Sequence, residues 1–309
     1  MIGWLMAKRK AKSKRYAVQR HMELAGLISG DNTLHYMDIA RFLSECNHRL
    51  YRQSRVYKAK VSNLGLSDKQ NKVHVYVLRD TWMLQKAAQL AKDTFDKNMS
   101  EERDLVGASS RWQDFRMNLA PRNTNIAEIL PAVRYNNTMG TLFSLNQGEF
   151  NTSRVFDESG NPSVFGFRVT PEGDSYSVVE EYDKTANTSD DPSSSAHPSQ
   201  AAYDGLDADV QPAARDDLQT RGNSPPYNKT SLDGDKLFRK VAVLGCSTDG
   251  NQRLSTGFFD APLGLVVFET DGGINTDTDF YEIEIAAGDY KGVHAETYIE
   301  AKKYGHRRA

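Results

Sequence analysis

Basic side chains crowd the first twenty residues of this chain, and no acidic residue lies among them. The positions are Lys8, Arg9, Lys10, Lys12, Lys14, Arg15 and Arg20. Positive charge at this density predicts contact with a polyanion, because each cation that neutralises a phosphate releases a bound counterion. The same composition is typical of a nuclear localisation signal. The alternative interpretation is a solvated terminus without a specific partner.

A second basic group follows where the chain is expected to fold. Its members are Arg49, Arg52, Arg55, Lys58 and Lys60. Because they extend the positive region beyond the terminus, they predict a nucleic-acid-facing surface on the folded part. The competing interpretation is an ordinary charged strand face, with polar side chains that alternate with apolar ones.

Oxygen-bearing side chains gather in a late hairpin, although the chain as a whole carries a formal net charge of only -2. Asp271, Asn275, Asp277 and Asp279 alternate with other residues there, and a hard cation such as calcium binds oxygen ligands. These four residues are therefore a candidate calcium site. The glycine and glutamate of an EF-hand loop are missing from the register, which favours a polar hairpin tip without a metal.

Catalytic constellations are not found in the sequence. It contains no nucleophile elbow, phosphate-binding loop or dinucleotide fingerprint, and its histidines show no metal spacing. We therefore expect no enzymatic activity and no cofactor. Two cysteines, Cys46 and Cys246, exclude a disulfide framework and favour a reducing compartment. The apolar runs are too short to span a membrane.

The periodicity of apolar residues predicts the elements that position these groups. Alternation over 57–61 and 73–77 predicts two strands, and helical spacing predicts helices over 16–28, 36–50, 81–98 and 112–119. Beyond residue 121 the pattern is almost wholly β. Because the later strands have no helices between them, we expect a mainly β protein: an antiparallel jelly-roll sandwich with helical insertions between the early strands and a short helical N-terminal segment.

The expected organisation has three parts. A basic N-terminal arm covers 1–20, a helical N-terminal segment covers 21–50, and a jelly-roll domain covers 51–309. The domain is expected to carry a polar insertion at about 184–232, since that stretch is rich in serine, proline and aspartate and buries too little apolar surface to fold alone.

Four stretches resemble single-jelly-roll capsid proteins of small circular single-stranded DNA viruses. They are NHRLYRQ (47–53), RDTWM (79–83), SRWQDFR (110–116) and DAPLGL (260–265), within a resemblance that covers 8–182 and 237–301. The resemblance implies a viral capsid protein that self-assembles into an icosahedral homo-oligomeric shell and encloses single-stranded DNA. It also implies location in the virion, and in the host nucleus during assembly. The arm is shorter here than in many such proteins, which favours genome binding shared with the second basic group.

Two other classes of protein stay open on the sequence alone. A non-assembling nucleic-acid-binding β-protein would use the arm as its main contact and bind as a monomer or dimer. A lectin-like β-sandwich would place a carbohydrate site among Trp82, Trp112 and the acidic hairpins. Deletion of 1–20 separates the two, because it abolishes binding in the first case and leaves glycan binding intact in the second.

Overall fold

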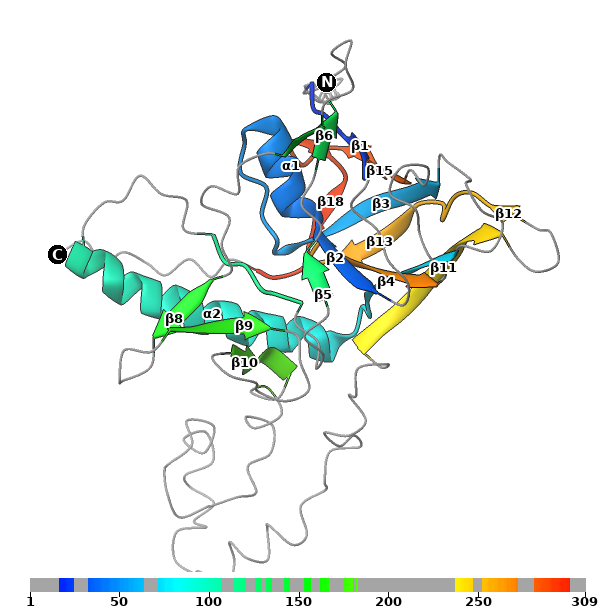
Figure 1. Cartoon of the computed structure of the whole chain (residues 1–309). Coiled ribbons are helices and arrows are strands. Elements are labelled where there is room, and N and C mark those ends of the chain that lie inside the picture. Colours follow the sequence, from blue (N-terminus) through cyan, green and yellow to red (C-terminus); the bar gives the residue numbers. More distant parts are fainter. Residues whose placement is uncertain are drawn as a thin grey trace, which may run out of the picture.

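Two mainly antiparallel sheets pack face to face in the computed structural model of this chain (Figure 1). The structure describes residues 17–24, 33–63, 72–106, 114–119, 126–128, 132–134, 142–144, 153–156, 162–166, 175–179, 182, 237–246, 252–271 and 281–300. The expectation of a mostly β, antiparallel protein with helices between early strands is confirmed.

The first sheet has the strand order β1–β15–β3–β13, with β18 also paired to β3. Its strands are β1 (His21–Glu23), β3 (Arg55–Asn63), β13 (Phe259–Pro262), β15 (Tyr281–Ile285) and β18 (Ala295–Thr297). All of these pairings are antiparallel. Between β15 and β18 the chain leaves β3 and forms a small hairpin of β16 (Ala287–Gly288) and β17 (Gly292–Val293).

The second sheet has the strand order β12–β11–β4–β14–β2–β5. Its strands are β2 (Leu34–Asp38), β4 (Lys72–Leu78), β5 (Ile126–Glu128), β11 (Phe238–Cys246), β12 (Gln252–Arg253) and β14 (Leu265–Asp271). The pairing of β2 with β5 is parallel, and the other pairings in this sheet are antiparallel.

The strand pairs nest along the chain. When β5, β12 and β18 are set aside, the two sheets contain, in sequence order, β1, β2, β3, β4, β11, β13, β14 and β15, hereafter the eight main strands. The first pairs with the last, the second with the seventh, the third with the sixth and the fourth with the fifth. Most of these contacts therefore join segments that are far apart in sequence.

The hydrophobic core lies between the two sheets. On the first sheet Tyr57, Ala59 and Val61 of β3 are buried, and on the second Val75 and Phe268 are buried opposite them. The alternation in β3 and β4 arises because successive side chains of a strand point to opposite faces. Burying each side chain of this size contributes roughly 1.5–3 kcal/mol, so the core stabilises the pairing of the sheets.

Helix α1 (Ile39–Asn47) closes one end of this core. Its N-cap is Asp38, whose carboxylate accepts hydrogen bonds from the main-chain N–H groups of Ala40 at 2.8 Å and Arg41 at 3.1 Å. Aspartate is a favoured N-cap because it satisfies N–H groups that lack a helical partner. The apolar face of α1 then packs Phe42 and Leu43 into the core.

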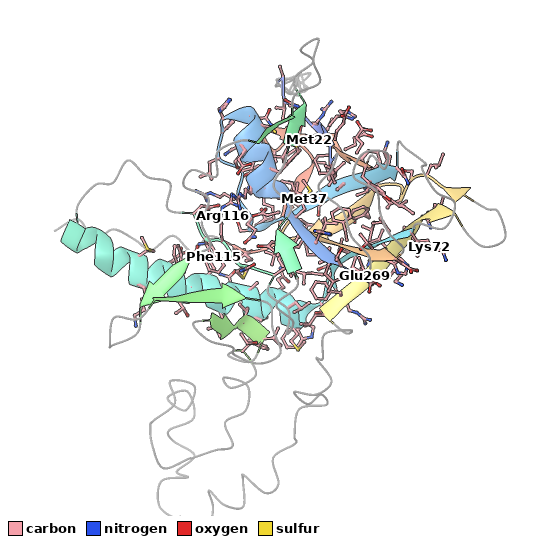
Figure 2. The ribbon with its side chains drawn as sticks, viewed as in Figure 1. Met22, Met37, Lys72, Phe115, Arg116 and Glu269 are labelled. Carbon is pink, nitrogen blue, oxygen red and sulfur yellow. The ribbon has the colours of Figure 1, made fainter. Side chains whose placement is uncertain are left out.

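Helix α2 (Trp82–Val106) packs against part of the outer face of the second sheet, and its other end extends away from the sheet (Figure 1). Leu84, Ala88, Ala91 and Phe95 are buried along one face, at the spacing of an amphipathic helix. Phe95 packs on Phe115 with ring centroids 5.4 Å apart, and Figure 2 shows Phe115 beside the helix. No helix among the described residues is long and apolar enough to cross a membrane.

Short strands accompany α2 and β1 outside the two main sheets. They are β6 (Ala132–Arg134), β7 (Leu142–Ser144), β8 (Arg154–Phe156), β9 (Pro162–Gly166) and β10 (Ser175–Ser177). All of them belong to the chain between β4 and β11, at 79–237. The polar insertion expected at about 184–232 falls within that connection but lies outside the described residues.

Within the helical N-terminal segment expected over 21–50, residues 21–23 and 34–38 form strands instead, and helix α1 covers 39–47. In place of a helix over 16–28, residues 17–20 have no regular structure and β1 follows. Met22 and Leu24 are buried while His21 is exposed, because pairing with β15 imposes a period of two on a stretch that also fits a helix. The next helix begins at Ile39 rather than at 36, since β2 occupies the preceding residues.

The helix expected over 112–119 is also wrong for 114–119, which the structure describes as non-helical. Phe115, Met117 and Leu119 are all buried against α2 and the second sheet. Their spacing of two residues is that of an extended segment. Apolar side chains at 112, 115 and 119 fitted a helix equally well, so the local pattern alone was ambiguous.

Candidate nucleic-acid interface

The five basic residues predicted to form one surface lie in two separate places. Arg49, Arg52 and Arg55 lie in and directly after the turn that joins α1 to β3, while Lys58 and Lys60 lie farther along β3. The neighbours of both lysines are buried in the core, so strand alternation turns both lysines outward on the first sheet. The structure thus separates the two lysines from the three arginines.

Lys291, from the β16–β17 hairpin, joins the three arginines. Its ammonium group donates a hydrogen bond to the carbonyl oxygen of Leu50. The Tyr51 hydroxyl donates to the carbonyl oxygen of Lys291 at 2.9 Å. Burial lowers the pKa of the Lys291 ammonium group, and the nearby positive charges of the three arginines lower it further. Arg49, Arg52, Arg55 and Lys291 are hereafter the basic cluster.

Tyrosine rings hold the basic cluster in place. The ring of Tyr290 meets those of Tyr51 and Tyr57 edge-on, with centroids 5.9 Å and 6.5 Å apart. The Arg55 guanidinium carbon lies 3.6 Å from the centroid of the Tyr290 ring, a cation–π contact. The main-chain N–H of Arg52 donates to the Tyr290 hydroxyl at 3.2 Å. These contacts join two segments that are about 240 residues apart in sequence.

Local turns position the cluster's side chains. At the end of α1, His48 adopts a left-handed conformation with φ 47°. The next residue, Arg49, donates its N–H to the Ser44 carbonyl oxygen at 3.2 Å. The Ser44 hydroxyl then accepts from the Tyr51 N–H at 2.8 Å, which turns the chain back toward β3. Arg49 and Arg52 consequently remain exposed on the turn.

The two lysines of β3 lie among acids. Lys60 forms an ion pair with Glu284 of β15. The hydrogen bond from Lys60 lowers the pKa of the Glu284 carboxyl, although burial opposes this effect. Lys58 lies opposite Asp260 of β13 in the strand register. The outer face of the first sheet therefore has the mixed charge described by the alternative interpretation, an ordinary charged strand face.

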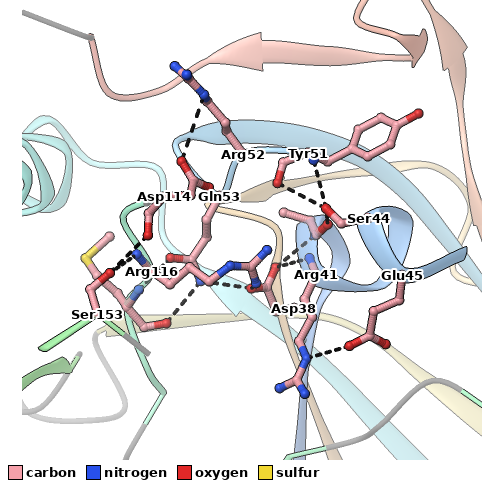
Figure 3. Close-up of polar contacts among 12 residues, drawn as sticks. Asp38, Arg41, Ser44, Glu45, Tyr51, Arg52, Gln53, Asp114, Arg116 and Ser153 are labelled. Carbon is pink, nitrogen blue, oxygen red and sulfur yellow. Dashed lines mark hydrogen bonds and ion pairs between the residues drawn. The ribbon is translucent and has the colours of Figure 1, made fainter. Parts of the chain in front are cut away.

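A buried polar network lies next to Arg52 of the basic cluster (Figure 3). Arg116 donates from Nη1 to Oδ2 of Asp38 at 2.7 Å, and their side chains are only 6% and 7% exposed. Gln53 donates from Nε2 to the carbonyl oxygen of Met117 at 3.0 Å and accepts from the Met117 N–H at 2.7 Å. The network therefore ties 114–119 to the N-terminus of α1 and to the turn before β3.

Asp114 connects this network to the basic cluster. Its Oδ1 lies 3.9 Å from Nε of Arg52, and its side chain is 15% exposed. Its Oδ2 is buried and accepts no hydrogen bond from the part of the chain that the structure describes. Burial raises the pKa of the Asp114 carboxyl to about 6, even though Arg116 and Arg52 act in the opposite direction. Asp114 therefore titrates near the pH of a weakly acidic compartment.

Replacing Asp114 by asparagine is expected to stabilise the fold at neutral pH. A raised folded-state pKa means that stability is greatest below the ordinary aspartate pKa and declines as pH rises through about 6. The neutral side chain avoids this loss, so D114N should gain about 2 kcal/mol at about pH 8 and almost nothing at about pH 4. Urea unfolding followed by tryptophan fluorescence at both pH values measures the difference. A variant that is less stable than the native chain at the higher pH would contradict the account.

The basic arm reaches the sandwich beside the basic cluster. Lys8, Arg9, Lys10, Lys12, Lys14 and Arg15 lie outside the described residues. Arg20 is described, and its carbonyl oxygen accepts from the Ile285 N–H at 2.9 Å. Gln19 exchanges two hydrogen bonds with Asn47 at the end of α1, at 2.8 Å and 3.1 Å. The chain thus leads from the arm to a point two residues from Arg49.

Most residues of the other predicted sites lie outside the described part of the chain. Of the candidate calcium site, three residues lie outside the described part: Asn275, Asp277 and Asp279. Oδ2 of Asp271 lies 3.9 Å from Nε2 of His74. The part of the chain that the structure describes contains no group of three or more potential metal ligands. Trp82 is exposed and meets Tyr182 edge-on, with centroids 6.5 Å apart. Trp112 also falls outside the described part, so the lectin-like site stays a hypothesis.

Sequence reasoning missed Tyr290, Lys291 and Asp114. The available signal was a tyrosine–lysine pair in a hairpin flanked by Gly288 and Gly292. The role of that pair is recognised only from its hydrogen bonds with the turn after α1, which is far away in sequence.

Comparison of the chain with protein families, curated proteins and solved structures found no match in any of the three.

Proposed function

We propose that this protein is a viral capsid subunit with a single jelly-roll fold, which self-assembles into an icosahedral shell and encloses nucleic acid. The observation that carries the proposal is the nested pairing of the eight main strands in two packed sheets. The mechanism is not catalytic. The sandwich gives each subunit a fixed shape, and basic groups neutralise phosphates without reading a base sequence.

The strand order supports the jelly-roll assignment. A jelly roll contains eight antiparallel strands in two sheets, arranged as two Greek keys, and it is common among viral capsid proteins. When one long antiparallel hairpin is folded into a sandwich, its first strand pairs with its last, its second with the next to last, and so on. The pairs β1–β15, β2–β14, β3–β13 and β4–β11 follow this order. Because lectins and other proteins share the fold, the order supports the architecture more strongly than the function.

The distribution of positive charge supports enclosure of a polyanion. The arm joins the sandwich at Gln19, which is bonded to Asn47, and the basic cluster begins two residues later. The described end of the arm, at Gln19, and the basic cluster therefore lie at the same end of the subunit. In a shell, that end would face the interior, where it would neutralise the phosphates of the packaged strand. The resemblance noted in the sequence favours single-stranded DNA as that strand.

Sedimentation of the purified chain, with and without single-stranded DNA and nuclease, tests this function. We expect large, uniform particles that protect their nucleic acid from digestion. A monomer or dimer at every salt concentration, with added DNA included, would overturn the proposal. Salt-sensitive DNA binding by such a small species would favour the non-assembling nucleic-acid-binding protein. Glycan binding that survives removal of 1–20 would favour the lectin-like sandwich.

A further inference from the structure

The conformation of Lys291 is unusual for a lysine. Its φ of 53° lies in the left-handed region, and the next residue, Gly292, also has a positive φ of 95°. A non-glycine residue pays roughly 1–2 kcal/mol for this conformation. The main chains of Tyr290 and Val293 exchange two hydrogen bonds at 3.0 Å, and a two-residue hairpin turn of this kind requires positive φ at both central residues. The turn places the Lys291 ammonium group against Leu50, beside the exposed Arg49 and Arg52.

We propose that Arg49, Arg52 and Lys291 bind a phosphate group of the enclosed nucleic acid, and that ionised Asp114 weakens this binding by competing for Arg52. The inference rests on the proposed function, since it takes the packaged strand as the ligand. It adds a specific site on the folded domain, and a pH dependence, to the neutralisation expected from the arm.

The chemistry of the cluster suits a phosphate. Guanidinium groups offer paired N–H donors that match phosphate oxygens, and an ammonium group adds a compact charge. The Arg52 side chain is 54% exposed, which leaves it accessible to a ligand. Burial lowers the pKa of Lys291, and repulsion from the three arginines lowers it further. A bound phosphodiester monoanion would relieve that repulsion, so the cluster favours anions even before the arm contributes.

Asp114 lies between Arg52 and the rest of the buried network (Figure 3). The charged groups that act on it are Arg52 from the turn, Arg116 from its own segment, Asp38 from the cap of α1, Lys92 from α2 and Lys291 from the hairpin. Above about pH 6 the ionised carboxylate pairs with Arg52 and repels a phosphate. Below that pH the protonated carboxyl releases Arg52, and phosphate binding strengthens.

Binding of a fluorescent oligothymidylate to the full-length chain, below the concentration at which shells form, tests the proposal. In the double variant R52Q/K291N, asparagine suits the left-handed position. Loss of the one phosphate that the cluster neutralises lowers the slope of log affinity against log salt by about 0.7, so we expect a decrease of up to about 0.7. The control R239Q removes an exposed arginine from β11 and should leave the slope unchanged.

The pH dependence is tested by comparing D114N with the native chain. Between about pH 7.5 and about pH 5, native affinity should rise about fivefold more than that of D114N. Histidines such as His48 gain charge over the same range, but they are present in both proteins and cancel in the comparison. Identical salt slopes for R52Q/K291N and R239Q would overturn the phosphate site, and identical pH profiles would overturn the role of Asp114.

Failure of this inference is distinguishable from failure of the proposed function. Nuclease-resistant particles from R52Q/K291N, with an unchanged salt slope for its oligothymidylate binding, would overturn the phosphate site and leave the capsid proposal intact. A reduced slope in a chain that never assembles would support the site and contradict the capsid proposal.

Discussion

Replacing Arg116 by methionine is expected to lower the free energy of unfolding by about 3–5 kcal/mol. The guanidinium of Arg116 is the charged partner of Asp38, and both side chains are almost fully buried. Methionine keeps much of the side-chain volume but removes the charge. It therefore leaves the Asp38 carboxylate buried beside Asp114 without a compensating cation, and a buried unpaired charge is among the costliest defects in a fold.

Urea unfolding of R116M, of D38S and of the double variant D38S/R116M measures this effect. Serine at position 38 retains an N-cap oxygen for α1 but carries no charge. We expect the double variant to be more stable than R116M, since no buried charge then lacks a partner. Additive losses in the double variant would show that Asp38 and Arg116 do not act as a pair, contrary to the 2.7 Å contact between them.

Neutralising the basic arm is expected to leave shells intact but largely deprived of nucleic acid. The change replaces the six residues Lys8, Arg9, Lys10, Lys12, Lys14 and Arg15 by glutamine. If each contacts a phosphate, the salt slope of single-strand binding falls by up to about 4. The amount of packaged nucleic acid per particle should fall several-fold. The ratio of nucleic-acid to protein ultraviolet absorbance in purified particles measures this decrease.

The matched control neutralises exposed cations on other surfaces, Lys86 on α2 and Arg239 on β11, and should package normally. Residual packaging in the arm variant is expected to depend on the basic cluster, because the arm ends beside it. An arm variant that packages as much as the native chain would contradict a role of the arm in neutralisation. Loss of particles altogether would indicate that the arm contributes to assembly.

Parts of the fold follow from local sequence patterns. The alternation of Lys58 and Lys60 with buried residues predicted β3, and the valines of β4 predicted its strand in the same way. Helix α2 was predicted from the spacing of its apolar face, although it extends to Val106, beyond the expected end. In each case the element shows a strong period over many residues, which is the condition under which local patterns are informative.

Other parts depend on partners far along the chain. β1 is a strand because β15, about 260 residues later, supplies its hydrogen bonds. The basic residues that the sequence pattern placed on one surface are also divided, between the turn after α1 and the outer face of β3. Likewise, Asp38 and Arg116 are 78 residues apart, and neither has a local signal that it is buried and paired. Tertiary pairing overrides local preference in such segments.

The basic cluster could likewise be predicted only in part from the sequence. Composition predicted Arg49, Arg52 and Arg55. Lys291 lies beside them because it belongs to the hairpin between β15 and β18, and both of these strands pair with β3. Asp114 was part of a stretch expected to be helical. Its proximity to Arg52 depends on the extended path of 114–119 and on the bonds between Gln53 and Met117.

Electron microscopy of the purified full-length protein tests the capsid proposal most directly. The account predicts closed, hollow particles of uniform size and icosahedral symmetry, with the end of α1 and the basic cluster of each subunit facing an interior that contains nucleic acid. Single subunits or small irregular assemblies across salt conditions, with single-stranded DNA present, would contradict it. Closed particles with the basic cluster on their outer surface would contradict the proposed site of nucleic-acid binding.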